Sequence, residues 1–318
     1  MTKLLIGGYS GSKGQGTGIT VLDGDQVIAT VPADSPSWLT RHPHLPVLYA
    51  VAETDEGGVH AWALRDGVPA EPLGTGATGG AEPAHLTVDE SGRFLVTANY
   101  TGGSICVHRL GADGSIGPPT DLVKHERHGE HPRQDMAHPH MVLPLDDGLV
   151  ITDLGGDSLY RYGLTDDGKL VPDGVVATPP GSGPRHALPV GDRRYVTAEP
   201  SGQVLTYDAS WRLLGAVPAS CSDRPNQPSE LVTDGRYLYV ANRGPDTVAI
   251  FDRQGELPRY LTEVATDCWP RHIALDDGSL YVANERSHEL MRMRIDLATG
   301  IPAPAEIIEL RSPTIVLP

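Results

Sequence analysis

The sequence predicts an all-β fold, a seven-bladed β-propeller in which each blade has four antiparallel strands. Three observations support this prediction. First, a short segment recurs along the chain, with the pattern apolar, Tyr or Leu, Val, any residue, Ala, then Asn or Glu. Second, a proline stands 14 to 17 residues before the end of each complete copy, and third, a turn-forming segment separates this proline from the copy. Units of roughly 40 to 50 residues built from short strands and turns are typical of propeller blades.

The recurring segment sets the number of units. Its copies end at positions that we call the anchor residues, which are Gly8, Glu53, Asn99, Asp153, Glu199, Asn242 and Asn284. Successive anchors are 45, 46, 54, 46, 43 and 42 residues apart, so seven units fill the 318 residues. A pair of β-sandwiches would not require seven phased copies.

Each complete unit begins with a short apolar strand after its proline. These prolines are Pro36, Pro83, Pro139, Pro184, Pro228 and Pro270. A turn such as residues 276–278 connects this strand to the anchor strand, and an alternating strand such as residues 247–252 follows the anchor. We therefore expect strand, hairpin, strand, turn and strand in each unit, with the first strand innermost.

The two ends of the chain are expected to complete one blade. The first unit has no proline strand, whereas residues 313–317 look like that missing strand standing alone. Pairing the ends closes the ring and removes open sheet edges. No linker, low-complexity tract or helical period interrupts the repeat, so we predict a single β-propeller domain covering residues 1–318, and with its edges closed we expect a monomer.

The composition argues against several classes of partner. Lys and Arg number 25 against 41 Asp and Glu, a net charge of −16, which opposes binding to nucleic acid or an anionic membrane. Residues 1–8 lack an apolar stretch long enough for a signal peptide, which predicts a cytoplasmic protein. Cys106, Cys221 and Cys268 have no CxxC spacing and are predicted to be buried free thiols.

The repeat also locates a candidate site. The start of the first strand and the end of the second lie at the same end of an antiparallel hairpin, so the residues after the prolines and those at and just after the anchors should border one end of the central channel. Units one to three place mostly small or uncharged residues there. Units four to seven place a charged set there, which is His140, Arg185, Glu199, Arg243 and Arg271.

This charged set predicts an anion-binding pocket. Arginine presents a planar pair of donors that suits carboxylate or phosphate. A carboxylate among the arginines can act as a general base toward water, while an arginine or His140 stabilises an oxyanion. The structural alternative is that these side chains form salt bridges between blades.

The remaining histidines are interpreted as structural. The three within residues 125–131 lie in an irregular segment that does not fix ligand geometry, so no metal site is predicted. His85, His186 and His272 stand one place after the channel-facing positions, where strand alternation is expected to turn them away. Residues 74–79 match GxGxxG, but no helix follows, so we interpret them as an inter-blade loop.

Several stretches together resemble the 6-phosphogluconolactonase family of seven-bladed propellers, which is also similar to the fungal carboxy-cis,cis-muconate cyclases. The stretches are Leu5-Ile6-Gly7-Gly8-Tyr9; His131-Pro132-Arg133-Gln134 with His138-Pro139-His140; Gly183-Pro184-Arg185-His186 with Ala198-Glu199; and Ala241-Asn242-Arg243-Gly244-Pro245-Asp246. The similarity spans essentially the full chain, and the Arg-Gln to His-Pro-His run is its most specific part.

The resemblance implies hydrolysis of a small anionic sugar lactone, 6-phospho-glucono-1,5-lactone, in the pentose phosphate pathway, without a metal or organic cofactor. The candidate catalytic residues are Glu199, His140, Arg185 and His138, and the candidate substrate-binding residues are Arg243, Arg271 and Arg133. We expect Glu199 to deprotonate the attacking water, because a δ-lactone is an activated ester that needs no covalent nucleophile. The alternatives are a cycloisomerase of a muconate-type diacid and a non-catalytic propeller that binds an acidic metabolite.

Overall fold

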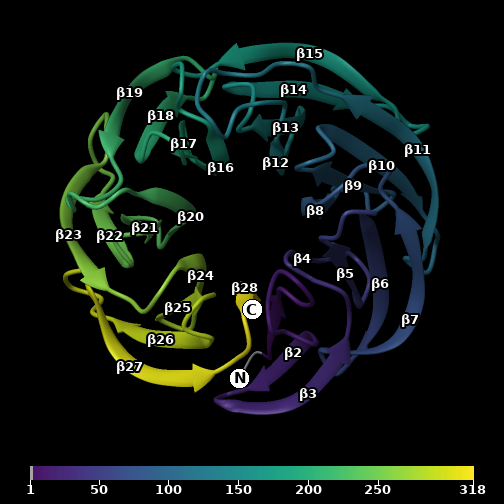
Figure 1. The fold of residues 1–318 in the computed structure, drawn as a ribbon, viewed down its shortest axis with the longest axis horizontal. Coiled ribbons are helices and arrows are strands. Elements are labelled where there is room, and N and C mark those ends of the chain that lie inside the picture. Colours follow the sequence, from purple (N-terminus) through teal and green to yellow (C-terminus); the bar gives the residue numbers. More distant parts are fainter. Residues whose placement is uncertain (1–2) are drawn as a thin grey trace.

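The computed structural model describes residues 3–318 as seven four-stranded antiparallel sheets arranged in a ring (Figure 1). The seven-bladed β-propeller predicted from the repeat is therefore confirmed. No helix of the length and hydrophobicity needed to span a bilayer occurs among the described residues.

The strands follow one another from the channel outwards in every blade. Blade one consists of β28 (Pro313–Leu317), β1 (Leu4–Gly8), β2 (Gly18–Asp23) and β3 (Gln26–Pro32). Blades two and three consist of β4 (Leu39–Arg41), β5 (Val47–Ala52), β6 (Gly58–Arg65) and β7 (Val68–Ala77), then β8 (Pro83–Val88), β9 (Phe94–Asn99), β10 (Ser104–Leu110) and β11 (Ile116–Lys124).

Blades four and five consist of β12 (Pro139–Leu145), β13 (Gly148–Asp153), β14 (Ser158–Leu164) and β15 (Leu170–Ala177), then β16 (Pro184–Val190), β17 (Arg193–Ala198), β18 (Gln203–Asp208) and β19 (Leu213–Pro218). Blades six and seven consist of β20 (Gln227–Thr233), β21 (Tyr237–Arg243), β22 (Thr247–Asp252) and β23 (Arg259–Ala265), then β24 (Pro270–Asp276), β25 (Ser279–Asn284), β26 (Glu289–Ile295) and β27 (Pro302–Glu309).

The chain termini close the ring within blade one. β1 pairs antiparallel with β28, with Leu5 opposite Leu317 and Ile6 opposite Val316. Figure 1 shows both ends of the chain at this blade. The expected pairing of the two ends is confirmed, and it gives β1 a neighbour on each side.

Apolar side chains pack between neighbouring blades. Each of seven buried clusters combines strands of two adjacent blades. Phe94 of blade three, for example, packs in one cluster with Ile151 of blade four, and both side chains are fully buried. This packing fixes the relative orientation of the blades and therefore the positions of the side chains at the channel.

The opening proline of each innermost strand lies beside the anchor of the next strand. Pro83 pairs with Asn99 and Pro139 with Asp153, and Pro184 pairs with Ala198, the residue before Glu199. The predicted placement of prolines and anchors at the same end of each hairpin is confirmed.

A β-bulge follows this proline in most blades. The register shifts directly after the proline in β8, β12, β16, β20 and β24, and at the corresponding end of β28. A bulge inserts one extra residue into the innermost strand and breaks the alternation of side chains. Two consecutive residues after the proline can therefore both reach the channel.

Two local predictions were wrong. Only Cys106 is buried, whereas Cys221 is exposed and Cys268 is partly buried, although all three are free thiols. Residues 74–77 of the GxGxxG segment belong to the outer strand β7, not to a loop, since Gly76 pairs with Val59 of β6.

Candidate functional site

Glu199 lies at the centre of the charged set at one end of the channel. It directly follows β17, and its backbone N–H donates to the carbonyl oxygen of Gly183 at 2.9 Å. Its residue surface is only 1% exposed. A fully buried carboxylate requires compensating charge or hydrogen bonds.

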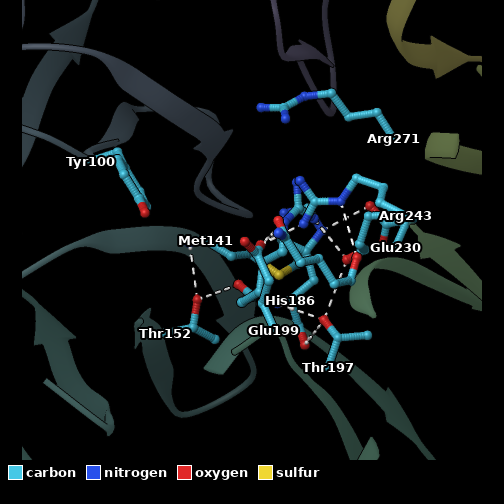
Figure 2. A network of polar contacts seen from close by, with 12 residues as sticks. Tyr100, Met141, Thr152, His186, Thr197, Glu199, Glu230, Arg243 and Arg271 are labelled. Atoms are coloured by element: carbon cyan, nitrogen blue, oxygen red, sulfur yellow. Dashed lines mark hydrogen bonds and ion pairs between the residues drawn. The ribbon is translucent and has the colours of Figure 1, made fainter. Parts of the chain in front are cut away.

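Three arginines from different parts of the chain supply that charge. Arg185 of β16 places Nε 3.0 Å from Glu199 Oε2, and Arg243 at the end of β21 places Nη2 2.6 Å from the same oxygen. Arg133, from the segment between β11 and β12, pairs through Nη1 with Oε1. Figure 2 shows Arg243 and Glu199 in this network, with Tyr100 on the opposite side of the site.

The arginines differ in their access to solvent. Arg185 and Arg243 are 3% and 4% exposed, whereas the Arg133 side chain is 38% exposed. Backbone carbonyls hold the two buried guanidiniums, because Arg185 Nη1 donates to Ser229 O at 2.6 Å and Arg243 Nε donates to Gln227 O at 3.0 Å. Arg133 is thus the member that a ligand from solvent meets first.

The cluster carries excess positive charge. Burial by itself would raise the pKa of Glu199, but attraction to Arg243, Arg133 and Arg185 outweighs burial and holds that pKa well below its usual range. Burial and the neighbouring Arg243 lower the pKa of Arg185 to about 9, so Arg185 stays protonated at neutral pH. Three cations surround one anion, which leaves two uncompensated positive charges.

The segment that carries Arg133 explains the longest interval in the repeat, the 54 residues between Asn99 and Asp153. Gln134 holds this segment in place. Its buried Nε2 donates to Leu154 O at 2.8 Å and to Asp157 Oδ1 at 2.7 Å. The extra residues of this unit therefore form a bridge that brings a cation from before blade four to Glu199 of blade five.

The two candidate histidines of blade four have different surroundings. His138 places Nδ1 3.0 Å from Tyr100 O and Nε2 3.1 Å from Asp135 Oδ1, and its ring stacks on Tyr100 with centroids 4.4 Å apart. His140 is 6% exposed, and among the described residues its Nδ1 has no hydrogen-bond partner. The ring nitrogens of His138 are thus already engaged, whereas a nitrogen of His140 is free for proton transfer.

Arg271 belongs to a second cluster and makes no ion pair with Glu199 among the described contacts. Its Nη2 donates to the Tyr9 hydroxyl, and its Nη1 lies 3.7 Å from Glu285 Oε2. Burial would lower its pKa, but Tyr9 and Glu285 outweigh burial and raise it. Arg271 therefore has different hydrogen-bond and ion-pair partners from the three arginines around Glu199, although its charge helps to lower the pKa values of Arg185 and Arg243.

The second cluster contains another buried anchor carboxylate, Glu53, which is 7% exposed. Tyr9 Oη donates to Glu53 Oε1 at 2.9 Å, Lys13 Nζ donates to the same oxygen at 3.1 Å, and Ser37 Oγ donates to Oε2. Lys13 also pairs with Glu82 at 2.6 Å. The comparison of prolines and anchors did not include Lys13, which lies in the turn after β1 and adds a positive charge beside Glu53.

A layer of aromatic and ionisable side chains fills the channel next to Arg185. Trp38 lies 4.2, 5.2 and 5.3 Å, centroid to centroid, from His85, His186 and His272, which come from three different blades. The expectation that these histidines turn away from the channel was wrong. The β-bulge after each proline adds the residue that brings them inward.

Two of the three histidines in residues 125–131 have local partners. His125 places Nδ1 2.9 Å from Asp153 Oδ2 and Nε2 3.0 Å from Tyr162 Oη. His131 Nδ1 accepts from the backbone N–H of Arg133 at 3.2 Å. Within residues 3–318 we find no group of three His, Cys, Asp or Glu side chains arranged to hold a metal ion.

A surface cavity of about 420 Å³ adjoins Arg133. Its lining includes His131, Arg133, Arg224 and Gln227, together with serines of blades five and six. Gln227 Oε1 also accepts from Arg133 Nη1 at 3.3 Å. The cavity falls within the range of small-molecule sites and shares Arg133 with the buried cluster.

Sequence reasoning missed several members of the site. Tyr100, whose hydroxyl accepts from Arg133 Nη2 at 3.4 Å, directly follows the Asn99 anchor, and Gln227 directly precedes Pro228. Tyr100 stood in a compared place, just after an anchor, but was not singled out because it carries no charge, whereas Gln227 could have been found by extending the comparison to the residue before each proline. Glu230, the +2 residue after Pro228, required knowledge of the bulge.

Comparison with known proteins agrees with this architecture. A family model described as "Lactonase, 7-bladed beta-propeller" matches residues 3–318. The chain is 31% identical to the 6-phosphogluconolactonase of Bacillus subtilis strain 168, over 94% of this chain and 93% of that protein.

Two solved structures superpose on 99% of the chain and 98% of their own. A protein from Lactobacillus plantarum is 29% identical with a TM-score of 0.90. The periplasmic gluconolactonase of Pseudomonas aeruginosa is 28% identical with a TM-score of 0.87.

Proposed function

The chain belongs to the lactonase family of seven-bladed β-propellers and is a lactone hydrolase, and from this premise we propose that its substrate is 6-phospho-glucono-1,5-lactone. The product would be 6-phosphogluconate, formed in the pentose phosphate pathway. Two relatives support a gluconolactone, since one is named a 6-phosphogluconolactonase and the other a gluconolactonase.

One observation carries the choice of a phosphorylated substrate: Arg133, Arg185 and Arg243 converge on a single carboxylate. The two uncompensated charges match a phosphate dianion. Arginine also forms charge-assisted, paired hydrogen bonds with phosphate oxygens. This positive centre is local, because the whole chain has a net charge of −16.

The same guanidiniums suit the chemistry of ring opening. Attack of water on the lactone carbonyl places negative charge on the carbonyl oxygen, and preorganised cations stabilise such an oxyanion most strongly where water is excluded. Arg185 and Arg243 are buried and held by backbone carbonyls, so they need little reorganisation. We propose that one of them takes the oxyanion while Arg133 takes the phosphate.

Glu199 has a different role in this proposal from the one expected from the sequence. Three guanidiniums pair with its two oxygens, so this carboxylate is already engaged in the unliganded protein. We propose that Glu199 holds the arginines in place. The proton of the attacking water then needs another acceptor.

The test compares the two lactones in wild type and in Arg133→Ala. Acid release from freshly prepared 6-phospho-glucono-1,5-lactone and from glucono-1,5-lactone is followed above the spontaneous rate. A charge-assisted hydrogen bond contributes about 1.5–3 kcal/mol, so Arg133→Ala should lower kcat/KM for the phosphorylated lactone by about 10- to 100-fold. The unphosphorylated lactone should lose much less.

Arg224→Ala is the matched control. Arg224 lines the same cavity, but it bonds to Pro245 O and Asp246 instead of Glu199. The proposal predicts that this variant keeps the preference for the phosphorylated lactone. Equal losses for both lactones in Arg133→Ala would contradict a phosphate role for Arg133, and no turnover of either lactone by wild type would contradict the proposed substrate.

A further inference from the structure

The channel layer described above contains Trp38, His85, His186 and His272, and His140 lies against His186. This layer of histidines, with His140 included, contains two buried nitrogens without hydrogen-bond partners among residues 3–318. They are Nδ1 of His140 and Nε2 of His186. The two rings lie edge to face with centroids 5.1 Å apart, and the residues are 6% and 1% exposed. Several other buried side-chain atoms of the described residues also lack a partner, but these two nitrogens belong to adjacent rings beside the arginine cluster, and neither is engaged by another group.

Glu230 controls the tautomer of His186. Its Oε2 lies 2.7 Å from His186 Nδ1, and Figure 2 shows the two residues in the same polar network. Burial raises the pKa of Glu230, while His272, Arg185 and the backbone N–H of Leu231, which donates to Oε1 at 2.9 Å, act in the opposite direction and favour the ionised carboxylate. A carboxylate at Nδ1 keeps the proton there and leaves Nε2 as a lone-pair acceptor.

Nε2 of His186 is therefore a hydrogen-bond acceptor that lies beside the His140 ring, and a protonated His140 requires such an acceptor. If His140 accepts a proton at Nε2, its Nδ1 carries a hydrogen, and the nearest imidazole offers a lone pair. His140 also lies beside Tyr100, with centroids 5.5 Å apart, and Tyr100 contacts Arg133 at the opening of the site. His140 thus connects the arginine cluster with the Glu230–His186 pair.

We propose that His140 takes the proton from the attacking water, and that His186 and Glu230 are positioning residues that orient and support it. This inference rests on the proposed lactone hydrolysis. It assigns the proton acceptor, which the arginine cluster does not provide.

In the proposed reaction, His140 takes one proton from water and later gives it to the ring oxygen. Water oxygen bonds to the carbonyl carbon, one water proton passes to His140, and the carbonyl electron pair moves to the oxygen beside a guanidinium. When the tetrahedral intermediate collapses, the bond from that carbon to the ring oxygen breaks, and the ring oxygen receives the proton from His140. Lactone and water become the open hydroxy acid, and His140 is neutral again.

The surroundings keep the acceptor in its neutral form before attack. Burial first, and then nearby positive groups, lower the pKa of His140 and of His186 well below the usual range. The charged and titratable groups that face this pair are Arg185, Arg243, Arg271, Glu199, Glu230, His85 and His272. A bound phosphate offsets the arginines and so makes His140 more basic when substrate is present.

The experiment measures kcat, KM and pH profiles for four variants with the phosphorylated lactone. His140→Gln should lower kcat by about 100-fold or more with KM changed less than about threefold, because a general base contributes to the chemical step and not to ground-state binding. His186→Gln and Glu230→Gln should each lower kcat by about tenfold or more. Glu230→Gln should also move the acid limb of kcat to lower pH, since loss of the negative charge makes a protonated imidazole less stable.

His272→Gln is the matched control. His272 contacts the same Glu230 at 3.4 Å and the same Trp38, and it is as buried as His140, but it lies outside the His140–His186 pair. We expect it to keep kcat within about threefold of wild type. Equal losses in His272→Gln and His140→Gln would overturn the inference, because they would indicate a packing role for the whole layer.

A measurement on the wild-type protein tests the inference even where a variant fails to fold. Imidazole ¹⁵N chemical shifts report the tautomer of each of the 13 histidines, with His186 assigned from its own variant. The inference requires a hydrogen on Nδ1 of His186, and a hydrogen on Nε2 would overturn it. If wild type turns over the lactone and His140→Gln retains that activity, only the inference about His140 is overturned. If wild type shows no turnover, the proposed function on which the inference rests is overturned.

Discussion

Glu199→Gln is the substitution that most directly perturbs the electrostatic balance of the site. It keeps the size of the side chain but removes the one negative charge within the three-arginine cluster. Arg185 and Arg243, at 3% and 4% exposed, are then left as buried cations without their anion. Breaking a buried ion pair by removing one partner costs about 3–5 kcal/mol.

This cost can be converted into a melting temperature. For a chain of this length, each kcal/mol lowers Tm by about 2 °C, so we expect Glu199→Gln to melt about 6–10 °C below wild type. The measurement is calorimetric unfolding in phosphate-free buffer near neutral pH. Glu71→Gln is the control, because Glu71 pairs with Arg65 at the surface, with side chains 60% and 69% exposed, and such pairs contribute little.

The pH dependence follows from the depressed pKa of Glu199. Its stabilising effect is fully present above the pKa of the unfolded side chain, about 4.3, and is lost as the pH falls from there toward the folded-state pKa. The difference in Tm between wild type and variant should therefore be largest near neutral pH and shrink below about pH 4.

Added phosphate gives a second readout of the same balance. The variant has three uncompensated cations where wild type has two, so inorganic phosphate should raise the Tm of the variant by more than that of wild type. A variant that melts within about 2 °C of wild type and gains nothing extra from phosphate would refute the electrostatic reasoning.

Two further predictions concern the scaffold. Gly155→Ala should destabilise the protein and displace the Arg133 segment, because a Cβ at Gly155 would lie 1.8 Å from Met136 O. In the control Gly163→Ala, the new Cβ would have no neighbour closer than 4.0 Å. Equal melting temperatures for the two variants would contradict this account. Deleting residues 313–318 removes β28 and leaves β1 without its inner neighbour, so we expect the cooperative unfolding transition to be lost. A cooperative transition close to that of the full chain would show that blade one is stable without the pairing of β1 and β28.

The fold could be predicted because its signal is local and repeated. Each unit begins its hairpin with the proline and finishes it with the anchor, and antiparallel geometry alone brings pairs such as Pro83 and Asn99 together at the same end of the sheet. The convergence of Arg185 and Arg243 near Glu199 follows from the same register, since the residue after a proline, the anchor and the residue after an anchor all lie at the same end of the hairpin.

The remaining features depend on contacts between distant segments. His186 was expected to point away from the channel, because alternation along a strand does not reveal a bulge, which is a property of the pairing between two strands. The direction of Arg133 is set by Gln134 contacting Leu154 and Asp157, so no spacing within the segment itself encodes it.

The choice between His138 and His140 shows the same division. The sequence places both histidines beside Pro139 and offers no reason to prefer one. Packing against Tyr100 and Asp135 engages the nitrogens of His138, while the bulge places His140 against His186 with a free nitrogen. The sequence by itself determined the ring, its register and the charged sector; only the tertiary structure decided burial, pairing and protonation, because these depend on which blades meet across the channel.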